Sequence, residues 1–246
     1  MLSKSEIKYI QSLSDKKLRD QENVFIVEGV KMADEIITYS SALIKAIYAT
    51  EKWIVKNGNK ISNGILIHKL KADELQRLSQ LTVANEVIIL LRKPDFPHFN
   101  PENHPVVVAL DHIQDPGNLG TIIRTCDWFG VDYIICSPDS ADAFNTKVVQ
   151  AAMGSLMRVQ VRYQDINLFL SEFSMYTSCV AVLDGQSIND VTFPEKTVVI
   201  FGNESKGVSA GVQTDADIRF TIPRKGQAES LNVAVAAAIV LSKINT

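Results

Sequence analysis

The stretch "VVIFGNESKGVS", residues 198–209, joins four apolar residues to a polar segment with a glycine at each end. Four apolar residues in a row are typical of a strand that is buried on both faces of a parallel sheet. Asn203 and Glu204 stand where this strand leaves the interior, and α/β sheets bind their ligands at the carboxyl ends of parallel strands. The stretch therefore predicts an α/β fold with a ligand site after this strand.

Alternating strand and helix patterns surround this stretch. Short apolar runs predict strands, and segments with helical spacing of apolar residues predict helices. The strands are expected at 106–110, 132–136, 178–183, 197–201 and 218–222, and the helices at 119–130, 145–155, 167–176 and 230–244. Continuous apolar strands that alternate with helices predict a parallel sheet covered on both faces.

Polar loops follow three of the expected strands. They read "DHIQDPGNLGTIIRT" at 111–125, "GNESKG" at 202–207 and "PRKGQAESLN" at 223–232. The carboxyl ends of parallel strands lie at one edge of a sheet, so we expect the loops to form one site only if the three strands are neighbours.

A proline-rich segment, "PDFPHFNPENHP" at 94–105, interrupts the chain. Proline fixes φ and lacks a backbone donor, which excludes a helix and an interior strand alike. We therefore expect a domain boundary here, with a small α/β domain over 1–95 and a larger α/β domain over 106–246. In the first domain, strands are expected at 23–29, 44–50 and 86–93, and helices at 7–21, 30–40 and 72–79.

Composition narrows the class of protein. The 246-residue chain has a formal net charge of -3, with 15 Lys and Arg against 12 Asp and Glu in residues 1–100, and 10 against 16 in the remainder. A basic excess of this size is ordinary for a solvated surface and gives only weak evidence for nucleic-acid binding. Three widely separated cysteines favour buried thiols in a reducing cytoplasm. The apolar runs are too short for a membrane span, so we expect a soluble cytoplasmic protein without a membrane partner.

Several common site chemistries are excluded by their motifs. A phosphate-binding loop needs Lys and then Ser or Thr after its second glycine, whereas Val208 and Ser209 follow Gly207. Neither a GxGxxG dinucleotide fingerprint nor a GxSxG nucleophile elbow is present. The four histidines lack the spacing of metal ligands, so no metal site is expected.

The polar residues that remain are suited to holding a ligand rather than attacking one: Asn118, Arg124, Asn203, Glu204, Ser230 and Asn232. Arg124 is either a solvated helix residue or a cation aimed at the strand ends. Asn203 and Glu204 can serve a ligand or Arg124, although Asn203 can instead cap its own turn. Gly202 is expected to let the backbone approach a ligand, and Gly207 to allow the return turn. Ser230 has a structural interpretation too, as the N-cap of the last helix.

Three motifs in chain order resemble the signature motifs of the SpoU (TrmH-like) family of RNA ribose 2′-O-methyltransferases, in the SPOUT superfamily. They are "DPGNLGTIIRT", "GNESKG" and "IPRKGQAESLNVAVAAA", and "FIVEGVKMADEII" and "ILLRKP" resemble the small substrate-binding module that precedes the catalytic domain in many members. The resemblance implies a trefoil knot in the C-terminal part of the sheet, an exception to the rule that chains do not knot.

The resemblance implies methyl transfer from S-adenosylmethionine to a ribose 2′-OH of structured RNA, with rRNA preferred and tRNA left open. One alternative is a non-catalytic RNA-binding protein that keeps the fold, and another is methylation of a base nitrogen. The implied cofactor contacts are Gly202, Ile222 and Leu231, with the loop residues Asn203 and Gly207. The implied catalytic residues are Arg124, Asn118, Glu204, Ser230 and Asn232.

Two roles for Arg124 stay open at this point. The family's matching arginine is usually assigned as the base, yet a guanidinium normally never loses its proton in a protein. Arg124 can instead bind the substrate phosphate and stabilise the developing alkoxide while water takes the proton.

The expected last helix, 230–244, is apolar nearly all round and has its first charge at Lys243. A helix of this kind must be covered on every side. Together with the resemblance, this pattern predicts a homodimer that pairs through this helix and the first-motif region.

Overall fold

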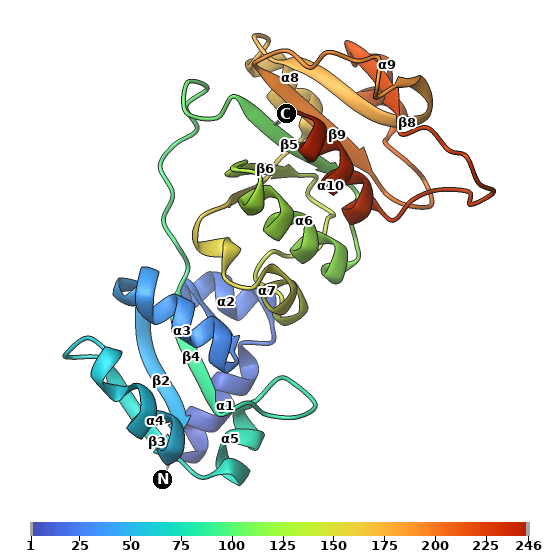
Figure 1. The fold of residues 1–246 in the computed structure, drawn as a ribbon. Coiled ribbons are helices and arrows are strands. Elements are labelled where there is room, and N and C mark those ends of the chain that lie inside the picture. The colour runs from blue at the N-terminus through green and yellow to red at the C-terminus, as the bar shows by residue number, and fades with distance from the viewer. Residues whose placement is uncertain (1, 245–246) are drawn as a thin grey trace. The chain divides into compact units, whose positions relative to one another are not determined.

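The computed structural model describes residues 2–244, which form two compact units. The first unit comprises residues 2–96 and Phe144–Met157, and the second comprises Pro97–Ala143 and residues 158–244. Each unit contains its own sheet (Figure 1). None of the helices within residues 2–244 is both long and apolar enough to cross a bilayer.

The first unit is built on a four-stranded sheet in the order β1-β4-β2-β3. Its strands are β1 (Val24–Glu28), β2 (Ile44–Thr50), β3 (Leu66–Leu70) and β4 (Val87–Arg92). Its helices before the linker are α1 (Lys4–Ser12), α2 (Lys16–Glu22), α3 (Val30–Tyr39), α4 (Glu51–Asn57) and α5 (Ala72–Leu78). The single helix expected at 7–21 is two helices, because the Asp15 side chain accepts from the Lys17 amide and starts a new one.

A segment from the later part of the chain belongs to this first unit. It contains α7 (Thr146–Ala152) and the 3-10 turn η3 (Ser155–Met157). The Phe144 ring lies 4.9 Å from the Phe25 ring between centroids, and Gln150 Nε2 donates to the Glu28 carbonyl at 3.0 Å. The compact units therefore differ in this segment from the linear division at 94–105 that the prolines indicate.

The second unit is built on six strands in the order β10-β8-β9-β5-β6-β7. They are β5 (Val106–Asp111), β6 (Tyr133–Cys136), β7 (Gln160–Tyr163), β8 (Thr177–Ser187), β9 (Thr197–Gly202) and β10 (Ile218–Thr221). Each pair of neighbours is parallel, which confirms the predicted parallel α/β sheet. The trefoil knot stays a prediction, because strand order alone does not establish it.

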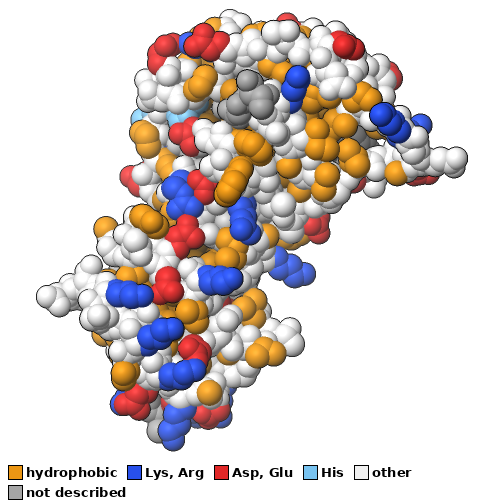
Figure 2. All heavy atoms as spheres, in the orientation of Figure 1, with side chains coloured by type: hydrophobic (Ala, Val, Ile, Leu, Met, Phe, Trp, Pro, Cys, Tyr) orange, Lys and Arg blue, Asp and Glu red, His pale blue; other side chains and the backbone are white. Residues whose placement is uncertain are grey.

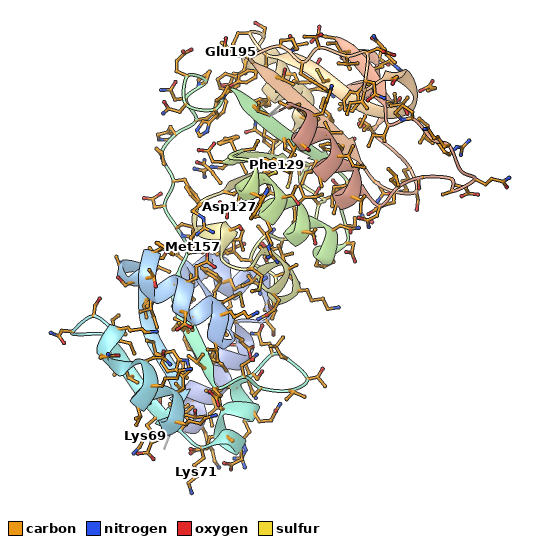
Figure 3. The ribbon with its side chains drawn as sticks, viewed as in Figure 1. Lys69, Lys71, Asp127, Phe129, Met157 and Glu195 are labelled. Atoms are coloured by element: carbon orange, nitrogen blue, oxygen red, sulfur yellow. The ribbon has the colours of Figure 1, made fainter. Side chains whose placement is uncertain are left out.

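Helices cover both faces of this sheet (Figure 1). On one face, α6 (Pro116–Trp128) packs beside α10 (Val233–Ile244), and α10 also contacts β9. On the other face, α8 (Ile166–Glu172) and α9 (Ala210–Thr214) cover a core that includes Val107, Ala109 and Ile200. Asp127 and Phe129 lie at the C-terminal end of α6 in Figure 3, and Asp127 is paired there with Arg158 at 2.7 Å. The N-terminal ends of α6 and α10 and the loops after the strands thus lie at the carboxyl edge of the sheet.

Candidate active site

Hydrogen bonds join the three motif segments at the carboxyl edge of the second sheet. Asn118, in the first turn of α6, donates from Nδ2 to Glu204 Oε1 in the loop after β9. Asn232, just before α10, donates from Nδ2 to Asn118 Oδ1 at 2.8 Å. The segments meet although β8 separates β9 from β10, so the expectation that all three strands must be neighbours was too strict.

Asn232 also starts the last helix. Its Oδ1 accepts from the Ala234 amide at 3.0 Å and from the Val235 amide at 3.3 Å, which satisfies two backbone donors of the first turn of α10. The N-cap interpretation of Ser230 is therefore wrong, and the helix begins at Val233 rather than at residue 230. Ser230 is exposed in the loop before the cap, where it borders a cavity at the strand ends.

The Asn203 side chain holds its own turn. Its Oδ1 accepts from the Ser205 and Lys206 amides at 2.9 and 3.1 Å, and its Nδ2 donates to the His112 carbonyl at 3.0 Å. The capping interpretation of Asn203 is thus confirmed. Its amide is already engaged within the protein, and Glu204 is bonded to Asn118 rather than to Arg124.

The two glycines of this turn, Gly202 and Gly207, are required for different physical reasons. Gly207 has φ +70°, the conformation that the return turn requires, and it exchanges two backbone hydrogen bonds with Asn203. A Cβ at Gly202 would lie 2.2 Å from the Gly207 carbonyl carbon and the Val208 nitrogen. Gly202 is therefore needed because its own loop returns over it, which corrects the expectation that a ligand alone sets this requirement.

Two residues at the end of β5 support this turn and were missed in the sequence. Asp111 is buried, and its Oδ2 accepts from the Ser209 amide at 2.7 Å. His112 provides the carbonyl that anchors Asn203, with φ +58°. A signal was present, since Asp111 is a carboxylate at a buried strand's exit, as Glu204 is.

A cavity of about 620 Å³ opens between the middle of β8 and the carboxyl ends of β9 and β10. Its volume falls within the usual range for small-molecule sites. Glu204 and Ser230 line it. The five candidate cofactor residues line it too: Gly202, Asn203, Gly207, Ile222 and Leu231. The middle of β8, at Leu183 and Asp184, lines it too, and the sequence did not point to these two residues. Among residues 2–244, no group of three or more His, Cys, Asp or Glu side chains is placed to hold a metal ion.

Arg124 lies outside the residues that line this cavity. It is exposed on α6, one helical turn before Trp128, whose exposed fraction is 84%. In the described part of the chain, no side chain hydrogen-bonds or ion-pairs with its guanidinium. Residues i and i+4 of a helix share a face, so Arg124 and Trp128 point to the same side of α6.

Family models match both parts of the chain. Residues 105–242 match the SpoU rRNA Methylase family, and residues 4–88 match the MRM3-like substrate binding domain. The chain belongs to the SpoU rRNA methylase family. This confirms the resemblance that the three motifs carry, and the SpoU match covers the α6, β9 and α10 segments that the Asn118 hydrogen bonds join.

Relatives of this SpoU-family chain match over nearly its full length. The 23S rRNA (guanosine(2553)-2′-O)-methyltransferase of Bacillus subtilis is 30% identical over 96% of this chain and 94% of that protein. A solved TrmH-family RNA methyltransferase structure from Porphyromonas gingivalis is 33% identical, with a TM-score of 0.85 over 99% of this chain and 98% of that one. An AdoMet-bound rRNA methyltransferase from Sinorhizobium meliloti is 26% identical, with a TM-score of 0.85 over 99% and 95%.

Proposed function

We propose that this SpoU-family protein transfers a methyl group from S-adenosylmethionine to a ribose 2′-OH of ribosomal RNA. The observation that carries the proposal is the hydrogen-bond chain Glu204–Asn118–Asn232, which joins the three motif segments beside the cavity. The names of the Bacillus subtilis and Sinorhizobium meliloti relatives supply the reaction and the cofactor class.

The cavity fits the proposed cofactor. Apolar side chains such as Ile222 and Leu231 offer a surface for an adenine ring, and the 202–207 turn offers polar groups beside it. Gly202, Ile222 and Leu231, with the backbone of Asn203 and Gly207, are the residues that would hold it. When bound, S-adenosylmethionine supplies a methyl group on a positively charged sulfur.

The protein's own residues then orient the RNA. Glu204, Asn118 and Asn232 fix the three segments relative to one another, and Ser230 at the cavity border is placed to hydrogen-bond a ribose hydroxyl. Alignment of this kind contributes about 7–11 kcal/mol in favourable intramolecular reactions.

Arg124 is best assigned to the substrate rather than to proton removal. A guanidinium is a permanent cation in proteins, and holding it neutral would need a dry environment. Arg124 is exposed, so we assign it to a phosphate and the developing alkoxide, with water taking the proton.

The two parts of the chain divide the work in this proposal. Residues 1–95 bind the RNA, in line with the substrate binding domain matched at 4–88, and residues 106–246 carry the reaction. We expect the protein to act in the cytoplasm as a homodimer. The apolar residues exposed on one face of α10 and its approach support pairing there: Leu231, Val235 and Ile239. Figure 2 shows hydrophobic side chains gathered over α10.

Two measurements test the proposed function. Calorimetry of the purified protein should detect binding of S-adenosylhomocysteine without added metal. Mapping of 2′-O-methyl groups by primer extension should show one rRNA methyl missing in a deletion strain and restored by the wild-type gene. If the protein binds S-adenosylhomocysteine but the methylation pattern is unchanged in the deletion strain, the non-catalytic alternative is favoured. If the protein does not bind S-adenosylhomocysteine, the proposal is overturned.

A further inference from the structure

Three basic side chains stand at the rim of the cavity. Lys206 comes from the turn after β9, and Arg224 and Lys225 come from the segment between β10 and α10. All three are exposed. The β10–α10 segment projects from the sheet in Figure 1, and basic side chains lie where it leaves the sheet in Figure 2. The loop after β9 and the segment after β10 start from strands that β8 separates, so the cations reach the cavity from two sides of β8.

These cations differ from others of the same unit by lacking an acidic partner. Lys196 is paired with Glu102, and Arg219 is paired with Asp184 at 2.9 Å. Within residues 2–244, no carboxylate pairs with Lys206, Arg224 or Lys225. Arg224 donates only from Nη1, to the Ala228 carbonyl at 3.0 Å, which closes its loop and leaves other donors facing solvent.

The second unit is acidic overall, so three cations together at the cavity differ from the rest of the unit. The second unit holds 9 Lys and Arg against 16 Asp and Glu, yet three of its nine cations gather at one rim. The same lining holds three acids: Asp184 is paired with Arg219, Glu204 accepts from the neutral Asn118 amide and keeps its charge, and Glu229 is exposed. Lys206, Arg224 and Lys225 thus outnumber Glu204 and Glu229 by one charge at the cavity mouth of an otherwise acidic unit, which favours an anion there over the rest of the unit.

We propose that Lys206, Arg224 and Lys225 bind backbone phosphates of the RNA next to the nucleotide whose ribose enters the site. The inference rests on the proposed function and adds RNA contacts to the catalytic unit. The cofactor does not explain the rim, because S-adenosylmethionine carries a sulfonium and an ammonium against one carboxylate. Phosphate contacts fix position and carry no sequence information, so these residues are positioning residues.

The test uses the full-length protein, saturated with S-adenosylhomocysteine, and a fluorescein-labelled 20-nucleotide oligouridylate. Affinity is measured by anisotropy from 50 to 200 mM salt for the wild type and for the triple variant Lys206→Gln, Arg224→Gln, Lys225→Gln. Each lost phosphate contact on a single strand lowers the slope of log affinity against log salt by about 0.7. The slope should therefore fall by about 2, so that the wild type loses about 16-fold more affinity than the variant over this range.

A matched pair of single variants controls for charge number. Lys225→Gln and Lys196→Gln each remove one cation from the second unit, and only the first should lower the slope, by about 0.7. Binding of S-adenosylhomocysteine should be equal in all variants. An unchanged slope in the triple variant would overturn the inference while leaving the proposed function standing. Loss of S-adenosylhomocysteine binding in the triple variant would overturn it too, by assigning the rim to the cofactor.

Discussion

At the scale of single residues, Asn118 is decisive because it uses both halves of its amide. It donates to Glu204 and accepts from Asn232, which a carboxylate cannot do. Asn118→Asp should therefore set two carboxylates against each other and lower kcat/KM by about 10- to 100-fold, equivalent to about 1–3 kcal/mol. Asn100→Asp is the matched control, because Asn100 Oδ1 only accepts, from the Glu102 amide. Equal methyltransferase rates in the two variants would contradict the role given to Asn118.

Arg124 gives a second prediction at this scale. Arg124→Ala should lower kcat on the order of 100-fold, as expected for a lost donor to developing negative charge. Affinity for S-adenosylhomocysteine should stay within a few-fold, because Arg124 does not line the cavity. Arg124→Lys should lower kcat as well, since lysine keeps the charge but loses the planar, forked set of guanidinium donors. Single-turnover kinetics and calorimetry check both, and high activity of the Lys variant would mean that charge alone suffices.

Glu28, at the end of β1, provides a pH-dependent prediction in the first unit. Burial raises the pKa of this carboxyl, against the opposing effects of hydrogen bonds from Ser79 and the Gln80 amide. A carboxyl with a raised pKa in the folded state adds stability below its ordinary value of 4.5 and loses that contribution as pH rises through the folded pKa. Glu28→Gln should therefore flatten the dependence of the unfolding free energy on pH above 4.5, measured by urea titration. A variant with the wild-type pH profile would contradict this.

At the scale of elements, the sequence predicts every central strand and two of the four edge strands, β1 and β10. The central strands β5 and β9 are buried on both faces and read as continuous apolar runs. The missed strands, β3 and β7, are edge strands whose polar residues break the apolar run, as LIHKL and QVRY show, whereas the edge strand β1 reads as an apolar run and was predicted. The three site loops could be predicted because polar residues follow apolar strands. Their bonding partners could not, since the place of β8 between β9 and β10 is a property of the folded sheet.

The turn after β9 yields the prediction for this scale. Gly202→Ala should force the return backbone away and destabilise the protein by about 1–3 kcal/mol, because its Cβ would lie 2.2 Å from backbone atoms. The control is Gly226→Ala, where a Cβ meets nothing within 4 Å, so the expected change is below about 0.5 kcal/mol. Urea unfolding and S-adenosylhomocysteine calorimetry report both effects. Similar losses in the two variants would show that the return loop tolerates a side chain at Gly202.

At the scale of the whole molecule, α10 leaves an apolar face open. Val235 and Ile239 are 49% and 38% exposed, whereas Val240 and Leu241 are buried against the sheet side. A second subunit that covers this face would make the protein a dimer. Light scattering at micromolar concentration should give a dimer mass for the wild type and for Val55→Asp, an exposed apolar position on α4. Val235→Asp should give a monomer mass, and a monomeric wild type would exclude the dimer.

The packing of α7 affects how the two parts can be separated. Phe144 and Gln150 contact β1, so removing residues 1–95 would strip α7 of its packing partners. Surface substitutions in the intact chain therefore measure RNA binding by each part more cleanly than a truncation does.

The double use of Asn232 has a consequence for protein synthesis. The side-chain amide of Asn232 caps the last helix through Oδ1 and donates to Asn118 through Nδ2, so the link to Asn118 cannot form before residue 232 has been made. A nascent chain that halts before residue 232 can complete most of the second sheet but cannot complete the site. Nascent chains that lack residue 232 should thus have no methyltransferase activity, and the enzyme should become active only after α10 has been synthesised.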